Sequence, residues 1–93
     1  MLEKSGKKYN NEVNIKFSLG LLYHKKKEYD RSEQEYRQIL ESNPKNLKAL
    51  YYLGGLMKVQ KKYKEAIEYF NKYLEFRKDD RVKGLVDRLK AKV

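Results

Sequence analysis

Apolar residues recur every three or four positions along most of this chain, and charged or polar residues fill the positions between them. One stripe holds Leu50, Leu53, Leu56 and Met57. This spacing follows the 3.6-residue period of an α-helix that buries one face. Four other segments repeat it. The pattern therefore predicts an all-α chain with helices near residues 12–26, 29–42, 47–60, 63–76 and 80–92.

The predicted helices are separated by residues that begin or end helices. Pro44 lacks the backbone N–H that a helix interior requires, so it is expected in a break. Asn46 and Asp80 are suitable N-cap residues for the helices that follow them. The other breaks are expected near residues 26–27 and 61–62.

A shift of 34 residues lays the chain on itself, because residues 13–46 overlay residues 47–80 without a gap. Phe17/Tyr51, Ser32/Ala66 and Tyr36/Phe70 keep their character. Since the matches concentrate at apolar and small positions, the two units are expected to share one packing scheme. The identical pairs are Leu19/Leu53, Gly20/Gly54, Leu22/Leu56, Lys27/Lys61, Tyr29/Tyr63, Leu40/Leu74 and Glu41/Glu75.

Gly20 and Gly54 fall in the middle of predicted helices, where glycine costs about 1 kcal/mol relative to alanine. Such a residue is useful where its missing side chain lets another helix approach closely. Ser32 and Ala66 follow twelve residues later in each unit and are the expected facing positions. We therefore predict close antiparallel pairing of the two helices within each unit.

This ordered set of small and large residues resembles the 34-residue tetratricopeptide repeat (TPR). The first unit carries the resemblance in Leu19-Gly20-x2-Tyr23, Ser32, Tyr36 and Pro44, and the second in Leu50, Leu53-Gly54, Tyr63, Ala66 and Phe70. The resemblance implies antiparallel helical hairpins stacked as a short right-handed solenoid of about five helices. The expected repeat-packing residues are Leu19, Gly20, Ser32, Tyr36, Leu53, Gly54, Ala66 and Phe70.

Some positions depart from the family pattern. Lys16 stands where the family usually has a large apolar residue, and Lys78 replaces the proline of the second unit. Tyr73 fills a position that is usually alanine. The second helix pair is therefore expected either to be splayed or to pack against the last helix.

The two ends of the chain lie outside the repeated units. Residues 81–93 lack a Leu-Gly pair at the expected offset, but they carry one apolar stripe opposite a charged face. This pattern is typical of a helix that caps a solenoid. Residues 1–11 are polar and lysine-rich and are expected to be frayed. The stripe consists of Val82, Leu85, Val86, Leu89 and Val93.

In the resembled family, the first helix of each pair lines a concave groove that holds a peptide. Leu21, Phe17 and Tyr52 replace the asparagine and lysine side chains with which some members grip a terminal carboxylate, so that clamp is absent. The remaining groove suits a helix or extended peptide with apolar anchors and acidic flanks. Alternatively, these aromatic side chains, Tyr52 above all, pack against neighbouring helices. The candidate groove residues are Asn14, Phe17, Leu21, His24, Lys48, Tyr51, Tyr52, Gly55 and Lys58.

Composition narrows the classes of function. The 93 residues hold 23 Lys or Arg against 13 Asp or Glu, a net charge of +10, and no cysteine. Without cysteine there is no thiolate metal site and no thiol nucleophile. His24 is the only histidine, and the chain offers neither a nucleophile–base set nor a glycine-rich phosphate loop. We therefore expect no catalysis, metal or cofactor, and the resemblance implies a protein-interaction module.

The positive charge leaves two alternatives to peptide binding. Lysines 25, 26 and 27 and lysines 58, 61, 62 and 64 gather where the first helix of each pair ends, so a basic face could contact nucleic acid or an anionic surface. Arginine is scarce among the 23 basic residues, which disfavours nucleic acid. Because two repeats are few for a solenoid, self-association as a homodimer is the other alternative. No run approaches the roughly 20 apolar residues of a membrane span, and a cytoplasmic location is expected.

Overall fold

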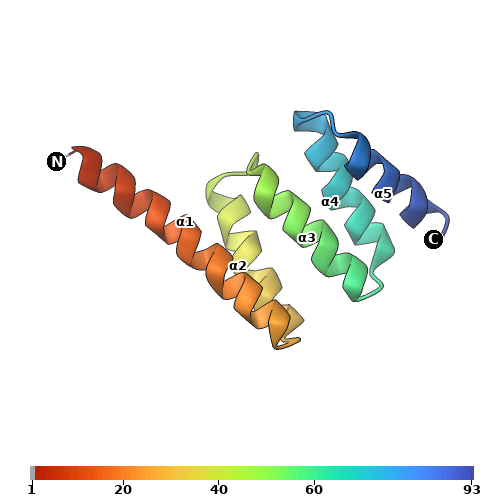
Figure 1. The fold of residues 1–93 in the computed structure, drawn as a ribbon, viewed down its shortest axis with the longest axis horizontal. Helices are drawn as coiled ribbons and strands as arrows, with labels where there is room; N and C mark the ends of the chain where they lie inside the picture. The colour runs from red at the N-terminus through yellow and green to blue at the C-terminus, as the bar shows by residue number, and fades with distance from the viewer. Residues whose placement is uncertain (1) are drawn as a thin grey trace.

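The computed structural model describes the backbone of residues 2–93 and the side chains of residues 12–93. It contains no strand within residues 2–93, so the all-α prediction is confirmed (Figure 1). The helices, in chain order, are α1 (Leu2–Lys25), α2 (Tyr29–Ser42), α3 (Leu47–Val59), α4 (Tyr63–Phe76) and α5 (Asp80–Lys90).

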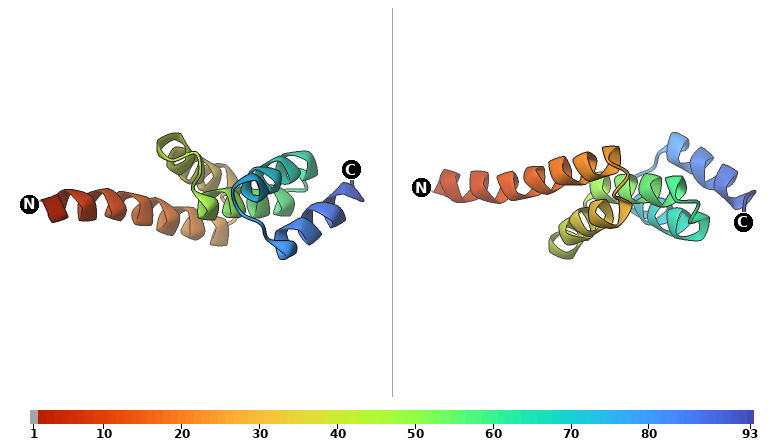
Figure 2. Two further views of the ribbon diagram at one scale, coloured as in Figure 1. Left: turned by 90° about the horizontal axis from the view of Figure 1, so that it is seen from above. Right: turned by 90° about the horizontal axis from the view of Figure 1, so that it is seen from below.

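The helices pack as neighbours in the order of the chain. α1 packs against α2 and α3 against α4, while contacts between α2 and α3 join the two pairs, and α5 packs on α4. Figure 2 shows α2 and α4 on one side of α1, α3 and α5. The stack therefore has two layers, and α1, α3 and α5 share one of them.

The first helix is longer than its periodicity predicted. α1 begins at Leu2, whereas the apolar pattern predicted a start near residue 12 after a frayed segment. The segment 2–11 contains no proline and is rich in Lys, which favours helix. The apolar stripe of α1 begins only at Val13. The spacing of apolar residues therefore could not predict that the helix starts earlier. The bounds of the other four helices agree with the prediction to within two residues.

The first helix of each unit ends in the same backbone turn. Lys27 and Lys61 have left-handed φ values of 64° and 63°. The Glu28 N–H donates to the Tyr23 carbonyl oxygen at 2.8 Å, and the equivalent bond in the second unit is 2.9 Å long. This is the Schellman arrangement, in which one left-handed residue closes the end of a helix.

Each mid-helix glycine admits an aromatic ring from the partner helix. A Cβ at Gly54 would lie 2.5 Å from Phe70 Cε1, and one at Gly20 would lie 2.6 Å from Tyr36 Cζ. A larger residue would overlap the ring, so glycine sets the distance between the paired helices. The Ser32 hydroxyl donates to the Gly20 carbonyl oxygen at 2.7 Å. Ser32 thus faces its glycine as expected, but the aromatic ring occupies the space of the missing side chain.

The expected repeat-packing residues lie inside the stack. Leu19 is half-buried, since no helix covers the outer side of α1. The others are buried: Gly20, Ser32, Tyr36, Leu53, Gly54, Ala66 and Phe70.

Two departures from the family pattern are accommodated by polar contacts. Lys16 Nζ donates to Gln38 Oε1 on α2 at 2.7 Å, so the lysine lies along the helix pair without burying its charge. Tyr73 is buried, and its hydroxyl donates to Asp79 Oδ2 at 3.2 Å. Of the two outcomes expected for Tyr73, the structure has the one in which it packs against the last helix.

α5 closes the stack as an amphipathic helix. Val82, Val86 and Leu89 are buried against the core, whereas Val93 lies beyond the helix and is exposed. The N-cap is Asp79, which accepts two backbone N–H groups of the first turn, the shorter bond being 2.9 Å. The cap therefore precedes the predicted Asp80 by one residue, because Asp79 is also the carboxylate within reach of the Tyr73 hydroxyl.

Candidate interaction groove

α1, α3 and α5 border a hollow near the end of α3, which we call the apolar hollow. Its volume is about 380 Å³, and Tyr36 and Phe70 form its floor. The side chains of Leu21, Tyr51 and Val59 remain 43%, 42% and 48% exposed there. The remaining lining residues are His24, Tyr52, Gly55, Lys58 and Leu85.

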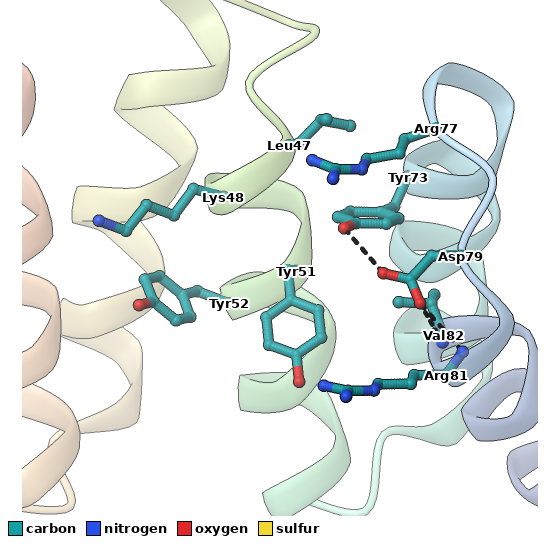
Figure 3. A pocket seen from close by; sticks show the side chains of 9 residues that line it. All are labelled: Leu47, Lys48, Tyr51, Tyr52, Tyr73, Arg77, Asp79, Arg81 and Val82. Carbon is teal, nitrogen blue, oxygen red and sulfur yellow. Dashed lines mark hydrogen bonds between the residues drawn. The ribbon is translucent and has the colours of Figure 1, made fainter.

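A second hollow of about 450 Å³ lies near the start of α3, between this helix and the α4–α5 junction. We call it the basic hollow (Figure 3). Tyr51 and Tyr52 line both hollows, which are therefore adjacent along α3, and we call the two together the groove. The basic hollow is lined by Leu47, Lys48, Tyr51, Tyr52, Tyr73, Arg77, Asp79, Arg81 and Val82.

The two shared tyrosines play different parts. The Tyr52 ring lies 5.7 Å from the Phe17 ring, edge-on, and is half-buried between the helices. The Tyr51 ring lies 5.9 Å from Phe70 and 6.1 Å from Tyr73. Its neighbours fix its orientation but leave a large part of it open to the groove. Tyr51 is therefore a pre-positioned aromatic surface, whereas Tyr52 is largely a packing residue.

Positive charge borders the basic hollow on both sides. Figure 3 shows Arg77 and Arg81 extending from the α4–α5 junction toward α3, on either side of Asp79. Lys48 lies opposite, with its Nζ 4.9 Å from the centroid of the Phe17 ring. None of these three basic residues takes part in an ion pair recorded within residues 12–93.

Asp79 holds the α4–α5 junction together and remains ionised. Desolvation raises its pKa, but the backbone N–H groups of Arg81 and Val82, the Tyr73 hydroxyl and the charge of Arg77 outweigh this and lower the pKa below its ordinary value. Burial, together with the hydrogen bond to Asp79, raises the pKa of Tyr73. The carboxylate is thus committed to the cap and to Tyr73.

The structure gathers most of the groove residues expected from the sequence. Asn14 lines neither hollow of the groove. It lies with Ile15 and Leu22 in a shallow hollow on the outer side of α1. Phe17 is only 6% exposed and packs 6.0 Å from the Tyr36 ring, so it belongs to the core and offers no surface to a ligand. The apolar hollow holds Leu21, His24, Tyr51, Tyr52, Gly55 and Lys58, and the basic hollow holds Lys48.

Sequence reasoning missed the contribution of α5 and of the junction before it. Arg77, Arg81 and Leu85 line the groove, although residues 81–93 were expected only to cap the stack. The 34-residue period held the signal, since Leu85 stands at the position of Phe17 and Tyr51. No periodic signal pointed to Arg77, which lies in the turn after α4.

The residues that the structure describes were searched for metal ligands and for membrane-spanning helices. Among them, no group of three or more His, Cys, Asp or Glu residues is placed to hold a metal ion. No helix that the structure describes is long and apolar enough to cross a membrane.

Comparison with known families identifies the class of protein. The tetratricopeptide repeat family profile matches residues 3–89. The chain therefore belongs to the tetratricopeptide repeat family, whose members are generally non-catalytic protein-interaction modules. The helical stack with its uncovered groove agrees with that general role.

Solved structures with the same fold include several of MamA. A crystal structure of the MamA protein superposes with a TM-score of 0.81 at 18% identity, covering 86% of this chain and 44% of that one. The structure of MamA AMB-1 gives a TM-score of 0.76 at 25% identity and covers 98% of this chain and 50% of that one. A MamA mutant gives 0.75 at 26% identity with coverages of 98% and 50%.

This chain therefore spans about half the length of the MamA structures that it matches. No match was found among curated proteins.

Proposed function

We propose that this chain is a non-catalytic module that binds a segment of another protein in the groove formed by α1, α3 and α5. The observation that carries the proposal is the exposure of Tyr51, an aromatic residue held in place by Phe70 and Tyr73 at the centre of the groove. Buried aromatic anchors dominate the energetics of many interfaces, and a rigid ring loses little entropy on binding.

The test uses a display library of random peptides selected on the whole chain. Selected peptides are expected to lose at least about tenfold in affinity on Tyr51→Ala, because the substitution removes the central contact surface. Phe76→Ala is the matched control, since Phe76 is 44% exposed at the end of α4 and lines neither hollow. Equal affinities for both variants and the unsubstituted chain would refute groove binding.

Phe17→Ala is not a suitable test of the groove. Phe17 is buried against Tyr36 and Tyr52, so its truncation removes core packing. Such a substitution typically costs about 3–5 kcal/mol of folding stability. Loss of binding in this variant would then reflect unfolding.

Self-association is a second candidate function, supported by one observation. Ile15 and Leu22 are 56% and 45% exposed on the outer side of α1, where they line a shallow apolar hollow with Leu19. Sedimentation equilibrium over a range of concentrations tests it. A dimer that dissociates on Leu22→Lys supports self-association through this surface, and a monomer mass at every concentration rejects it.

A further inference from the structure

The groove has two chemically different halves, and the difference specifies what it can hold. Resting on the proposed function, we infer that the bound segment is acidic at one end and apolar at the other. Its carboxylates lie between Arg77 and Arg81 in the basic hollow, and an apolar side chain enters the hollow between Leu21, Val59 and Leu85. The partner segment therefore has a fixed direction along α3.

The basic hollow supplies the preference for carboxylates. Arg77 and Arg81 extend into it from the α4–α5 junction, and neither forms an ion pair recorded within residues 12–93. The guanidinium group binds carboxylates through paired hydrogen bonds. Asp79 lies between them, but its oxygens already accept the Tyr73 hydroxyl and two backbone N–H groups. Both guanidinium groups therefore keep donors for an incoming anion.

The apolar hollow supplies a different preference. Leu21 from α1, Val59 from α3 and Leu85 from α5 meet around it, above the rings of Tyr36 and Phe70. Its polar borders are limited to His24 and Lys58 and the two shared tyrosines. Lys58 stands at the border of the hollow, whereas its interior is formed by aliphatic side chains and aromatic rings, so an apolar side chain is the favoured occupant of that interior.

The position of the hollows along α3 gives the spacing of the two anchors. The basic hollow takes residues 47, 48, 51 and 52 from α3, and the apolar hollow takes 51, 52, 55, 58 and 59. With a helical rise of 1.5 Å per residue, the centres of these sets are about 8 Å apart along the axis. That separation corresponds to between one and two turns of a bound helix, or to about two to three residues of extended chain.

Nucleic acid fits the groove less well. Binding of single strands relies on bases stacking on free aromatic faces. The Tyr51 ring has three aromatic neighbours, Tyr52, Phe70 and Tyr73, all within 6.2 Å. These neighbours pack on the buried part of the ring, and the exposed part faces the groove, where the apolar hollow offers a nucleobase few hydrogen-bond partners.

Peptide display on the whole chain, followed by fluorescence anisotropy with the enriched peptides, tests the inference. The enriched peptides are expected to carry Asp or Glu separated from Leu, Ile or Phe by the spacing given above. The Arg77→Gln/Arg81→Gln double variant is expected to bind them at least about tenfold more weakly, since hydrogen bonds between charged groups are lost. The matched control, Lys83→Gln/Arg88→Gln, removes the same charge from the outer face of α5 and should change affinity less than about twofold.

Each other outcome has a distinct meaning. Peptides that depend on Tyr51 but lack acidic residues, or that bind the Arg77/Arg81 variant unchanged, overturn the inference and leave the proposed function standing. Peptides that are independent of Tyr51, or no enrichment at all, overturn both. A single-stranded oligouridine probe that binds with the same dependence on Arg77 and Arg81 and displaces the peptides would assign the basic hollow to nucleic acid instead. Circular dichroism of every variant confirms that it is folded.

Discussion

The two 34-residue units place similar side chains at equivalent positions, yet they bury them to different extents. Ile15 and Leu22 of the first unit are 56% and 45% exposed, whereas their counterparts Ala49 and Leu56 of the second unit are fully buried. Unit 2 lies between α2 and α5, and unit 1 has a neighbour on one side only. In a stacked array, the neighbours of a residue decide its energetic weight as much as its own repeat does.

The units also differ in how they fill the space around their glycines. Unit 1 uses Ser32 and Tyr36, and unit 2 uses Ala66 and Phe70 at the same positions. The Ser32 hydroxyl donates to the Gly20 carbonyl oxygen, but the buried Tyr36 hydroxyl has no hydrogen-bond partner. Unit 1 therefore carries two buried hydroxyl groups, one satisfied and one not, at the two positions where unit 2 has the apolar Ala66 and Phe70.

The largest expected contrast concerns the equivalent leucines. Leu56→Ala should reduce the free energy of unfolding by about 2–5 kcal/mol, because it opens a cavity in the core. Leu22→Ala should cost less than about 1 kcal/mol, since much of that side chain is already in water. Urea unfolding followed by circular dichroism measures both. Equal losses would show that the outer side of α1 is covered in solution.

A second contrast lies between two adjacent glycines of α3. Gly54→Ala should destabilise the chain by about 1–3 kcal/mol, because the new methyl group overlaps the Phe70 ring. Gly55→Ala meets no atom within 4 Å and should stabilise the helix by up to about 1 kcal/mol. Thermal unfolding measures both, and the midpoint temperature should fall for Gly54→Ala and rise for Gly55→Ala. A stabilising Gly54→Ala would mean that Phe70 moves aside at little cost.

The serine of unit 1 gives a smaller effect. Ser32→Ala copies the residue of unit 2 and removes the hydrogen bond to the Gly20 carbonyl oxygen. We expect a loss of about 1 kcal/mol, the usual net value of such a bond. Urea unfolding measures it, with Ser42→Ala at the exposed end of α2 as the control. An unchanged stability would show that the helical bonds of α1 already satisfy that carbonyl group.

Removing the hydroxyl of Tyr36 should change stability in the direction opposite to that of Ser32→Ala. Burial raises the pKa of this phenol, and the nearby Ser32 hydroxyl opposes the shift only in part. Because the hydroxyl has no hydrogen-bond partner, Tyr36→Phe should leave stability unchanged or raise it by up to about 1 kcal/mol. The reverse change in unit 2, Phe70→Tyr, should be destabilising. A loss in Tyr36→Phe would show that the hydroxyl bonds to a neighbour, and the Ser32 hydroxyl is the candidate partner.

The smallest expected effect distinguishes the N-cap residues of α3 and α5. Asn46 caps α3 and has no titratable group, whereas Asp79 caps α5 with a carboxylate. The folded-state pKa of Asp79 lies below its ordinary value of 3.8. The stabilisation that the ionised Asp79 carboxylate gives the folded state is therefore fully present above pH 3.8. It is lost as the pH falls through the folded-state pKa. Asp79→Asn should remove this acid-dependent loss, while Asp80→Asn beside it should not. Thermal unfolding across acidic pH measures the difference, and identical pH profiles would contradict the assigned cap.

The sequence predicted features that repeat and missed features that occur once. Helix bounds and the role of the glycines followed from periodicity, because equivalent residues in both units pointed to the same role, whereas Tyr51 was placed in the groove by the resemblance to the tetratricopeptide repeat. Phe17 follows the alternative expected for the groove aromatics, packing against neighbouring helices, because Tyr36 and Tyr52 cover it; its equivalence to Tyr51 could not decide between the two. Arg77 and Asp79 were missed because the equivalent residues of the α2–α3 junction are Asn43 and Lys45, so the repeat gave no indication of a guanidinium group or a capping carboxylate there.

The two Schellman turns at Lys27 and Lys61 have a consequence for the rate of folding. Each turn joins helices whose contacting residues are close in the sequence, as Gly20 and Ser32 are. Closing such short loops costs little entropy, and chains dominated by local contacts fold in roughly microseconds to milliseconds. Each hairpin can therefore form before it docks on the next. The groove needs side chains from α1, α3 and α5, so it is completed only when the last helix arrives.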